Sequence, residues 1–84
     1  MMIDKKKLEK TIKEIIADRL DLDIKKIENN AILTKDLGMD SFGAVELTYE
    51  LKDKFGIEIP QEDFAKIKKV EDIVEYISNH MRER

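Results

Sequence analysis

The sequence predicts an all-α protein, a small four-helix bundle with a long first loop and a short third helix. Apolar residues recur at helical spacing in the first and last segments, and almost no stretch alternates as a strand would. The 84 residues fit a single domain, residues 1–84, with a thin core, because so small a domain buries little more than about 60% of its unfolded surface. Helices are expected over residues 4–19, 41–55, 60–66 and 70–81.

The first and last helices are predicted from amphipathic patterns, in which one stripe of a helix is apolar. Asp4 is a suitable N-cap for the first helix, whose apolar positions are Leu8, Ile12, Ile15 and Ile16. The last helix follows the i, i+3, i+4, i+7 template, with Val70, Ile73, Val74, Ile77 and Met81.

Between Leu20 and Asp40 the chain has no sustained apolar period, so a long loop is expected there. Its apolar anchors are Leu22, Ile24, Ile27, Ile32, Leu33 and Leu37. A loop of this length in so small a domain is unusual and usually has a function.

The third helix is predicted from the segment IEIPQEDFAKI that follows Gly56. Pro60 suits a first helical position, and Glu62 and Asp63 suit a first turn, where the helix dipole favours negative charge. The preceding IEI alternates like a strand, but no second strand is expected to pair with it.

The second helix has two faces when its residues are placed at about 100° intervals. The inner face has Ala44, Leu47, Thr48, Leu51 and Phe55, and the outer face has Phe42, Val45 and Tyr49, flanked by Glu46, Glu50 and Asp53. An outward apolar stripe edged with carboxylates is typical of a docking surface. The alternative is that the three apolar residues pack under the long loop.

Charge is unevenly distributed along the chain. Residues 36–63 contain eight acids and two lysines, a net charge of −6, so the rest of the chain carries +3 of the total of −3. The lysines near the N-terminus alternate with acids and apolar residues, as on a solvated helix face. Nucleic-acid binding is not expected, because a phosphate-binding surface needs concentrated positive charge.

The sequence contains no cysteine, no signal-like segment and no apolar run approaching the roughly 20 residues of a membrane span. We therefore expect a cytoplasmic protein without a membrane span, a disulfide or a thiolate metal site. The single histidine, His80, has no metal-ligand cluster beside it in the sequence, so no metal site is expected.

Ser41 stands where the loop becomes the second helix, directly after Asp40. A serine there is usually a cap, and Asp40 could equally be the cap. A hydrolytic serine is disfavoured, because Met39 replaces the first glycine of G-x-S-x-G and the only candidate base, His80, lies near the C-terminus. No catalytic residue is therefore expected.

The stretches LGMDSFGAVEL, FGIEIP and DFAKIKKVEDIVEYI together resemble the acyl carrier protein family over nearly the whole chain. The resemblance implies a four-helix bundle in which a phosphopantetheinyl transferase esterifies Ser41, beside Asp40, with the 4'-phosphopantetheine of coenzyme A. The thiol of that arm carries acyl groups as thioesters between enzymes. Since the chain has no cysteine, a thioester must use such an imported thiol.

The resemblance also implies a non-enzymatic monomer that serves acyl-transferring and chain-elongating enzymes of fatty-acid, polyketide or specialised lipid synthesis. Such partners would dock through basic patches on Asp36, Asp40, Phe42, Val45, Glu46, Tyr49, Glu50 and Asp53. An attached acyl chain is expected to shelter between the second helix and the long loop. The alternative is a helical interaction domain whose serine is never modified.

The chain departs from the family pattern at four positions. Phe42 and Gly43 replace a leucine and a second aspartate that are common in fatty-acid carriers, while Asp21 and Lys69 replace a frequent glycine helix stop and a Ser/Thr cap. The pathway therefore stays open between housekeeping fatty-acid synthesis and a specialised carrier. Aspartate before Ser41, where peptidyl carriers commonly have histidine, makes a peptide-synthetase role the less favoured one.

Overall fold

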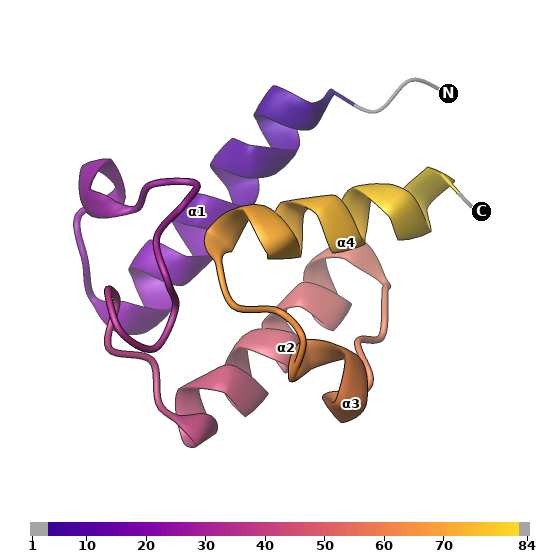
Figure 1. The fold of residues 1–84 in the computed structure, drawn as a ribbon. Helices are drawn as coiled ribbons and strands as arrows, with labels where there is room; N and C mark the ends of the chain where they lie inside the picture. Colours follow the sequence, from indigo (N-terminus) through magenta and orange to yellow (C-terminus); the bar gives the residue numbers. More distant parts are fainter. Residues whose placement is uncertain (1–3, 83–84) are drawn as a thin grey trace.

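The computed structural model describes residues 4–82, which form four α-helices and one 3-10 turn (Figure 1). These elements are α1 (Lys5–Leu20), η1 (Ile24–Lys26), α2 (Ser41–Phe55), α3 (Gln61–Phe64) and α4 (Val70–Arg82). Residues 4–82 contain no strand, and one isolated bridge pairs Ile32 with Lys69. The predicted all-α four-helix fold is confirmed. None of these helices has the length and apolar run needed to cross a bilayer.

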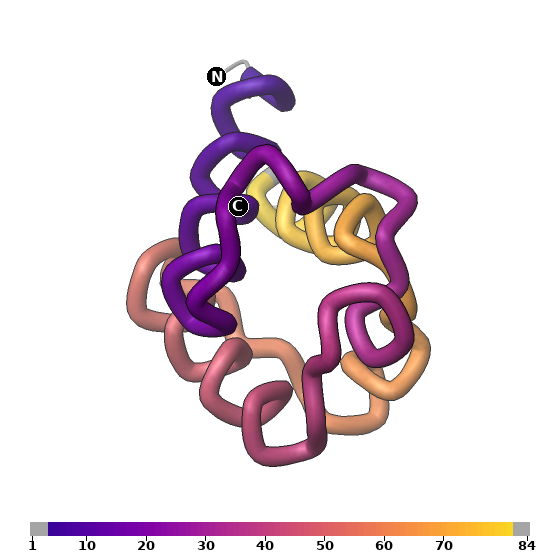
Figure 2. The backbone as a smooth tube through the Cα atoms, turned by 90° about the vertical axis from the view of Figure 1, so that its left-hand side faces the viewer, coloured from indigo at the N-terminus to yellow at the C-terminus, as the bar shows by residue number. Residues whose placement is uncertain are grey.

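The core is a layer of aliphatic side chains between α1, α2 and α4. α1 packs against both of the other helices, and in Figure 2 the chain winds around a common centre that these side chains fill. The residues with 0% exposure are Ile12, Ile16, Leu47, Leu51, Val70, Ile73 and Ile77. They lie on the apolar stripes that the helical period predicts. Packing of such a stripe against the core is what stabilises helices of this length.

α3 is shorter than the predicted range of 60–66. After Phe64 the chain tightens, and the N–H groups of Lys66 and Ile67 donate to carbonyls three residues back, those of Asp63 and Phe64. This turn directs Ile67 into the core. α3 is also joined to α4, because the hydroxyl of Tyr76 donates to Asp63 Oδ2 at 2.8 Å.

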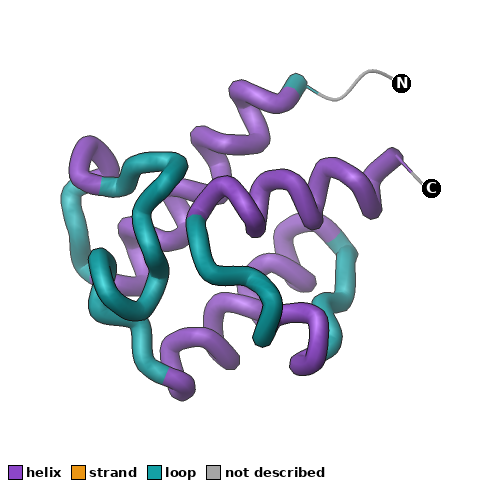
Figure 3. Tube along the Cα trace, viewed as in Figure 1, coloured by secondary structure: helices purple, strands orange, loops and turns teal. Residues whose placement is uncertain are grey.

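The long loop between α1 and α2 is held against the start of α4 (Figure 3). Leu33 N–H donates to the carbonyl of Lys68 at 2.9 Å, and the N–H groups of Val70 and Glu71 donate back into residues 29–31 at 3.1 and 2.8 Å. The Leu33 carbonyl accepts from Met39 N–H at 2.9 Å, so the same residue also fixes the chain just before α2.

Not all predicted loop anchors are buried. Ile27 and Leu33 are in the core, whereas Leu22, Ile24, Ile32 and Leu37 are half-buried. Ala31 and Met39, which the sequence analysis did not name, are buried as well. The loop is irregular because its internal backbone bonds form separate turns, while three others join it to residues 68–71.

The helix ends follow the capping chemistry of the sequence. Asp4 accepts from the N–H groups of Lys6 and Lys7, which confirms it as the N-cap of α1. α2 ends at Gly56 in the left-handed conformation (φ 68°), as glycine favours. α1 ends at Asp21 in the same conformation (φ 55°), which costs a side-chain-bearing residue roughly 1–2 kcal/mol.

We expect Asp21→Gly to be more stable than Asp21→Ala by about 1 kcal/mol, because only glycine adopts a left-handed backbone without a steric penalty. Urea unfolding of both variants, followed by circular dichroism, measures the difference. An alanine variant as stable as the glycine variant would contradict the left-handed end of α1.

Candidate functional site

Ser41 is the first residue of α2, and Asp40 is its N-cap. Asp40 Oδ1 accepts from Gly43 N–H at 2.7 Å, and the Asp40 carbonyl accepts from Ala44 N–H at 2.9 Å. Ser41 is exposed, and its hydroxyl makes no hydrogen bond within residues 4–82. Asp40, and not Ser41, is therefore the N-cap of α2, and the Ser41 hydroxyl is accessible.

The start of α2 favours negative charge. The first N–H groups of a helix have no carbonyl to bond within it, and Asp40 satisfies only that of Gly43 by its side chain. The N–H groups of Ser41 and Phe42 stay unbonded within the helix, and the dipole adds partial positive charge there. An anionic group on Ser41 would meet these donors.

Gly43 allows the cap to lie close to the helix. A Cβ at residue 43 would lie 3.2 Å from Asp40 Oδ1 and 3.5 Å from Met39 Cγ. The first of these contacts is tighter than usual, so a side chain there would push the capping carboxylate away. The glycine that weakens the helix by up to about 1 kcal/mol therefore also makes room for its cap.

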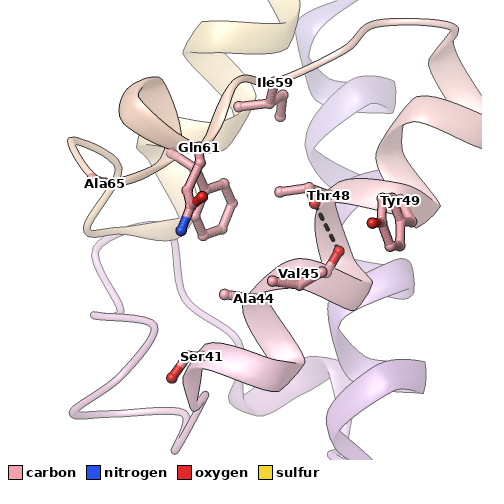
Figure 4. Close-up of a pocket in the computed structure, with 9 residues that line it drawn as sticks. Ser41, Ala44, Val45, Thr48, Tyr49, Ile59, Gln61 and Ala65 are labelled. Atoms are coloured by element: carbon pink, nitrogen blue, oxygen red, sulfur yellow. Dashed lines mark hydrogen bonds between the residues drawn. The ribbon is translucent and has the colours of Figure 1, made fainter.

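Ser41 lies at the edge of two hollows. The first, of about 380 Å³, runs between α2 and the segment of residues 59–65 (Figure 4). Its lining residues are Ser41, Ala44, Val45, Thr48, Tyr49, Ile59, Gln61, Phe64 and Ala65. The second, of about 390 Å³, includes Leu33, Met39 and Lys68.

The expected shelter for an acyl chain between α2 and the long loop stays a prediction, and the two hollows differ in whether they reach the loop. The second hollow reaches the loop at Leu33, Thr34 and Met39, whereas the first lies against α3 and does not touch the loop. The loop is held by backbone hydrogen bonds to the start of α4, whereas the backbone bonds around α3 are made within residues 60–67. Residues 61–65 were not predicted from the sequence as a lining of the site.

The outer face of α2 is apolar, as its helical layout predicts. Phe42 is 73% exposed, Tyr49 69% and Val45 44%, so the loop does not cover them. We call these three residues the α2 stripe. Large apolar side chains with this exposure in one row are typical of a contact surface.

The carboxylates beside the α2 stripe are partly engaged within the chain. Arg19, in the last turn of α1, donates through Nη1 to Glu46 at 3.0 Å and through Nη2 to Glu50 at 2.9 Å. The hydrogen bond to Glu50 raises the pKa of the Arg19 guanidinium, so this group stays a cation whenever the two carboxylates are charged. Arg19 was not predicted from the sequence, because its two partners are 27 and 31 residues away.

The remaining acidic candidates differ in their surroundings. Asp36 Oδ2 accepts from Ile32 N–H at 2.8 Å and closes a turn of the loop. Asp53 is exposed and makes no ion pair within the described part of the chain. Asp40 and Asp53 thus present charge near the two ends of α2, while its middle is paired with Arg19.

His80, the candidate base for Ser41, makes its contacts within α4. His80 Nδ1 lies 2.9 Å from the carbonyl of Tyr76, and its ring stacks on that tyrosine with a centroid distance of 4.0 Å, so it is engaged with its own helix. Residues 4–82 contain no group of three or more His, Asp or Glu side chains placed to hold a metal ion. The geometry offers an accessible hydroxyl at a helix start and an apolar stripe beside it.

Comparison with protein-family models matches residues 10–77 to the family described as phosphopantetheine attachment site. The match runs from the second turn of α1 into α4 and covers most of the 84 residues. It includes both hollows and the whole of α2.

Asp40→Ala should lower the free energy of unfolding by about 1 kcal/mol, because it removes the side-chain cap of α2. Asp40→Asn should stay close to the unchanged protein, since asparagine caps equally well. Thermal or urea unfolding of the two variants distinguishes them. Equal losses in both would mean that the charge of Asp40, and not its capping bond, stabilises α2.

Proposed function

This chain belongs to the phosphopantetheine attachment site family and has 4'-phosphopantetheine as its covalent cofactor; from that premise we propose that Ser41 is the attachment residue. The chain has two serines, and the other, Ser78, is 8% exposed in α4. Ser41 is exposed at a helix start and follows Asp40 in the motif that resembles acyl carriers. The accessible Ser41 hydroxyl is the observation that carries the proposal.

The surroundings of Ser41 fit a phosphate ester. Its oxygen is accessible, and the N–H groups of Ser41 and Phe42 together with the helix dipole would stabilise the anion. Gly43 leaves space for Asp40 to keep capping the helix. When bound, the arm supplies a thiol that holds an acyl group as a thioester, a group that this cysteine-free chain does not supply itself.

The function we propose is that of an acyl carrier without catalytic activity of its own. It would receive the arm from a phosphopantetheinyl transferase and carry acyl groups between enzymes of fatty-acid, polyketide or specialised lipid synthesis. The first hollow beside Ser41, between α2 and α3, is the place we propose for part of a short acyl chain. Burying each methylene there would contribute about 0.8 kcal/mol.

Partner enzymes are proposed to dock on the outer face of α2. The α2 stripe offers apolar contact next to Ser41, and the net charge of −6 over residues 36–63 favours basic partners. An unmodified interaction domain would use the same exposed stripe, so modification of Ser41 is what separates the two functions.

Incubation with coenzyme A and a promiscuous phosphopantetheinyl transferase should add one arm and one thiol to the protein. Intact mass measures this for the unchanged protein, for Ser41→Ala and for the matched control Ser78→Ala. We expect the adduct to disappear in Ser41→Ala alone. An adduct on Ser41→Ala, or none on the unchanged protein, would refute Ser41 as the attachment residue.

Phe42→Ala and Tyr49→Ala should each slow that modification roughly fivefold or more at low protein concentration, because truncation removes apolar contact with the transferase. The loss should vary little with salt, since screening acts on charges. Met81→Ala, which truncates an exposed apolar residue of α4, is the control and should react normally. Initial rates across a salt series decide the matter, and equal slowing in all three variants would argue against docking on α2.

A further inference from the structure

The ion pairs of Arg19 lie beside the α2 stripe, midway along α2. Arg19 reaches from α1 to two carboxylates of α2, and the three side chains are each a little more than one third exposed. Glu46 and Glu50 flank the α2 stripe one helical turn apart. A partner that approaches the stripe therefore meets a group with a net charge of −1, where the two carboxylates alone would present −2.

Arg19 occupies the positions that a cation of a partner would take. A guanidinium binds two carboxylate oxygens with its planar fork, and Arg19 uses both of its Nη atoms in this way. Because α1 and α2 are packed together, Arg19 is held at a high effective concentration next to Glu46 and Glu50. An arginine or lysine of another protein would have to displace it before it could pair with the middle of α2.

The ends of α2 differ from the middle. Asp40 and Asp53 are exposed and form no ion pair with the side chains of residues 4–81, and they are about 20 Å apart along the helix axis. Between them lies the α2 stripe. α2 thus combines an apolar outer face with negative charge near each of its ends.

We propose that Arg19 determines which proteins dock on this face. By holding Glu46 and Glu50 it selects a partner that has an apolar pocket for the α2 stripe and cations about 20 Å apart opposite Asp40 and Asp53. It disfavours a partner whose cations lie opposite the middle of α2. This inference rests on the docking face of the proposed function, but it does not require modification of Ser41.

The test uses a synthetic helical peptide with leucines on one face and arginines along its centre, titrated into the unmodified full chain. Binding is followed by amide NMR shifts and calorimetry at low and high salt. Arg19→Gln should bind the peptide about fivefold more tightly at low salt, because exposed ion pairs change an equilibrium by less than about tenfold. The gain should shrink at high salt, and the added shifts should centre on Glu46 and Glu50.

Lys10→Gln is the matched control, because Lys10 is an exposed lysine of α1 that lies on the opposite side of the helix from Arg19 at about 100° per residue. It should change the affinity less than twofold. Adding Glu46→Gln and Glu50→Gln to Arg19→Gln should abolish the gain. Equal gains in Arg19→Gln and Lys10→Gln, or a gain that survives the loss of both glutamates, would overturn the proposal.

Two further variants keep the outcome clear. Arg19→Lys retains the charge without the planar fork and should give an intermediate affinity, which serves as the test if Arg19→Gln fails to fold by circular dichroism. Ser41→Ala should bind the peptide as the unchanged protein does. A failure of Ser41 modification would therefore refute the proposed function and leave this result intact, whereas unchanged or weaker peptide binding by Arg19→Gln would refute the role of Arg19 alone.

Discussion

The arrangement of the site depends on the two backbone hydrogen bonds of Leu33. Its N–H bonds to Lys68, just before α4, and its carbonyl accepts from Met39, just before Asp40. Its side chain is buried in the core, so neither bond can shift without moving the loop. The start of α2, where Ser41 stands, is thereby fixed relative to α4 and to the connection that carries α3. A loop without regular structure positions the site because its polar groups are satisfied partly by its own turns and partly by residues 68–71.

The helices could be predicted because their signals are local. α1, α2 and α4 each have an apolar stripe of helical period and a suitable end residue, such as Asp4 or Gly56. The path of the long loop could not be predicted, because its bonds join residues 29–33 to residues 68–71 and leave no periodic pattern. α3 was predicted too long, because the turn after Phe64 accompanies the burial of Ile67 in the core, and that burial depends on the packing of the whole fold.

At the site, too, features that lie on one helix could be predicted, whereas contacts between helices could not. Ser41, its neighbour Asp40 and the outward position of the α2 stripe follow from spacing along one helix. Arg19 escaped prediction, since an arginine in the last turn of a helix is ordinary and its partners are determined by the packing of α1 on α2. The sequence therefore predicts the charges of the face, whereas only the fold determines which of them are already paired.

α3 has a consequence for how distant residues affect the site. A helix of four residues is too short to be stable alone, because the backbone entropy lost in forming its first turn outweighs the gain from its hydrogen bonds. α3 is stabilised by the burial of Ile59 and Ile67 beside it and by the hydrogen bond between Tyr76 and Asp63. The α3 side of the first hollow therefore keeps its position only while α3 stays attached to α4. A substitution at Tyr76 would alter the surroundings of Ser41 although Tyr76 does not line the hollow beside it. Natural selection that acts on the site would therefore also act on α4.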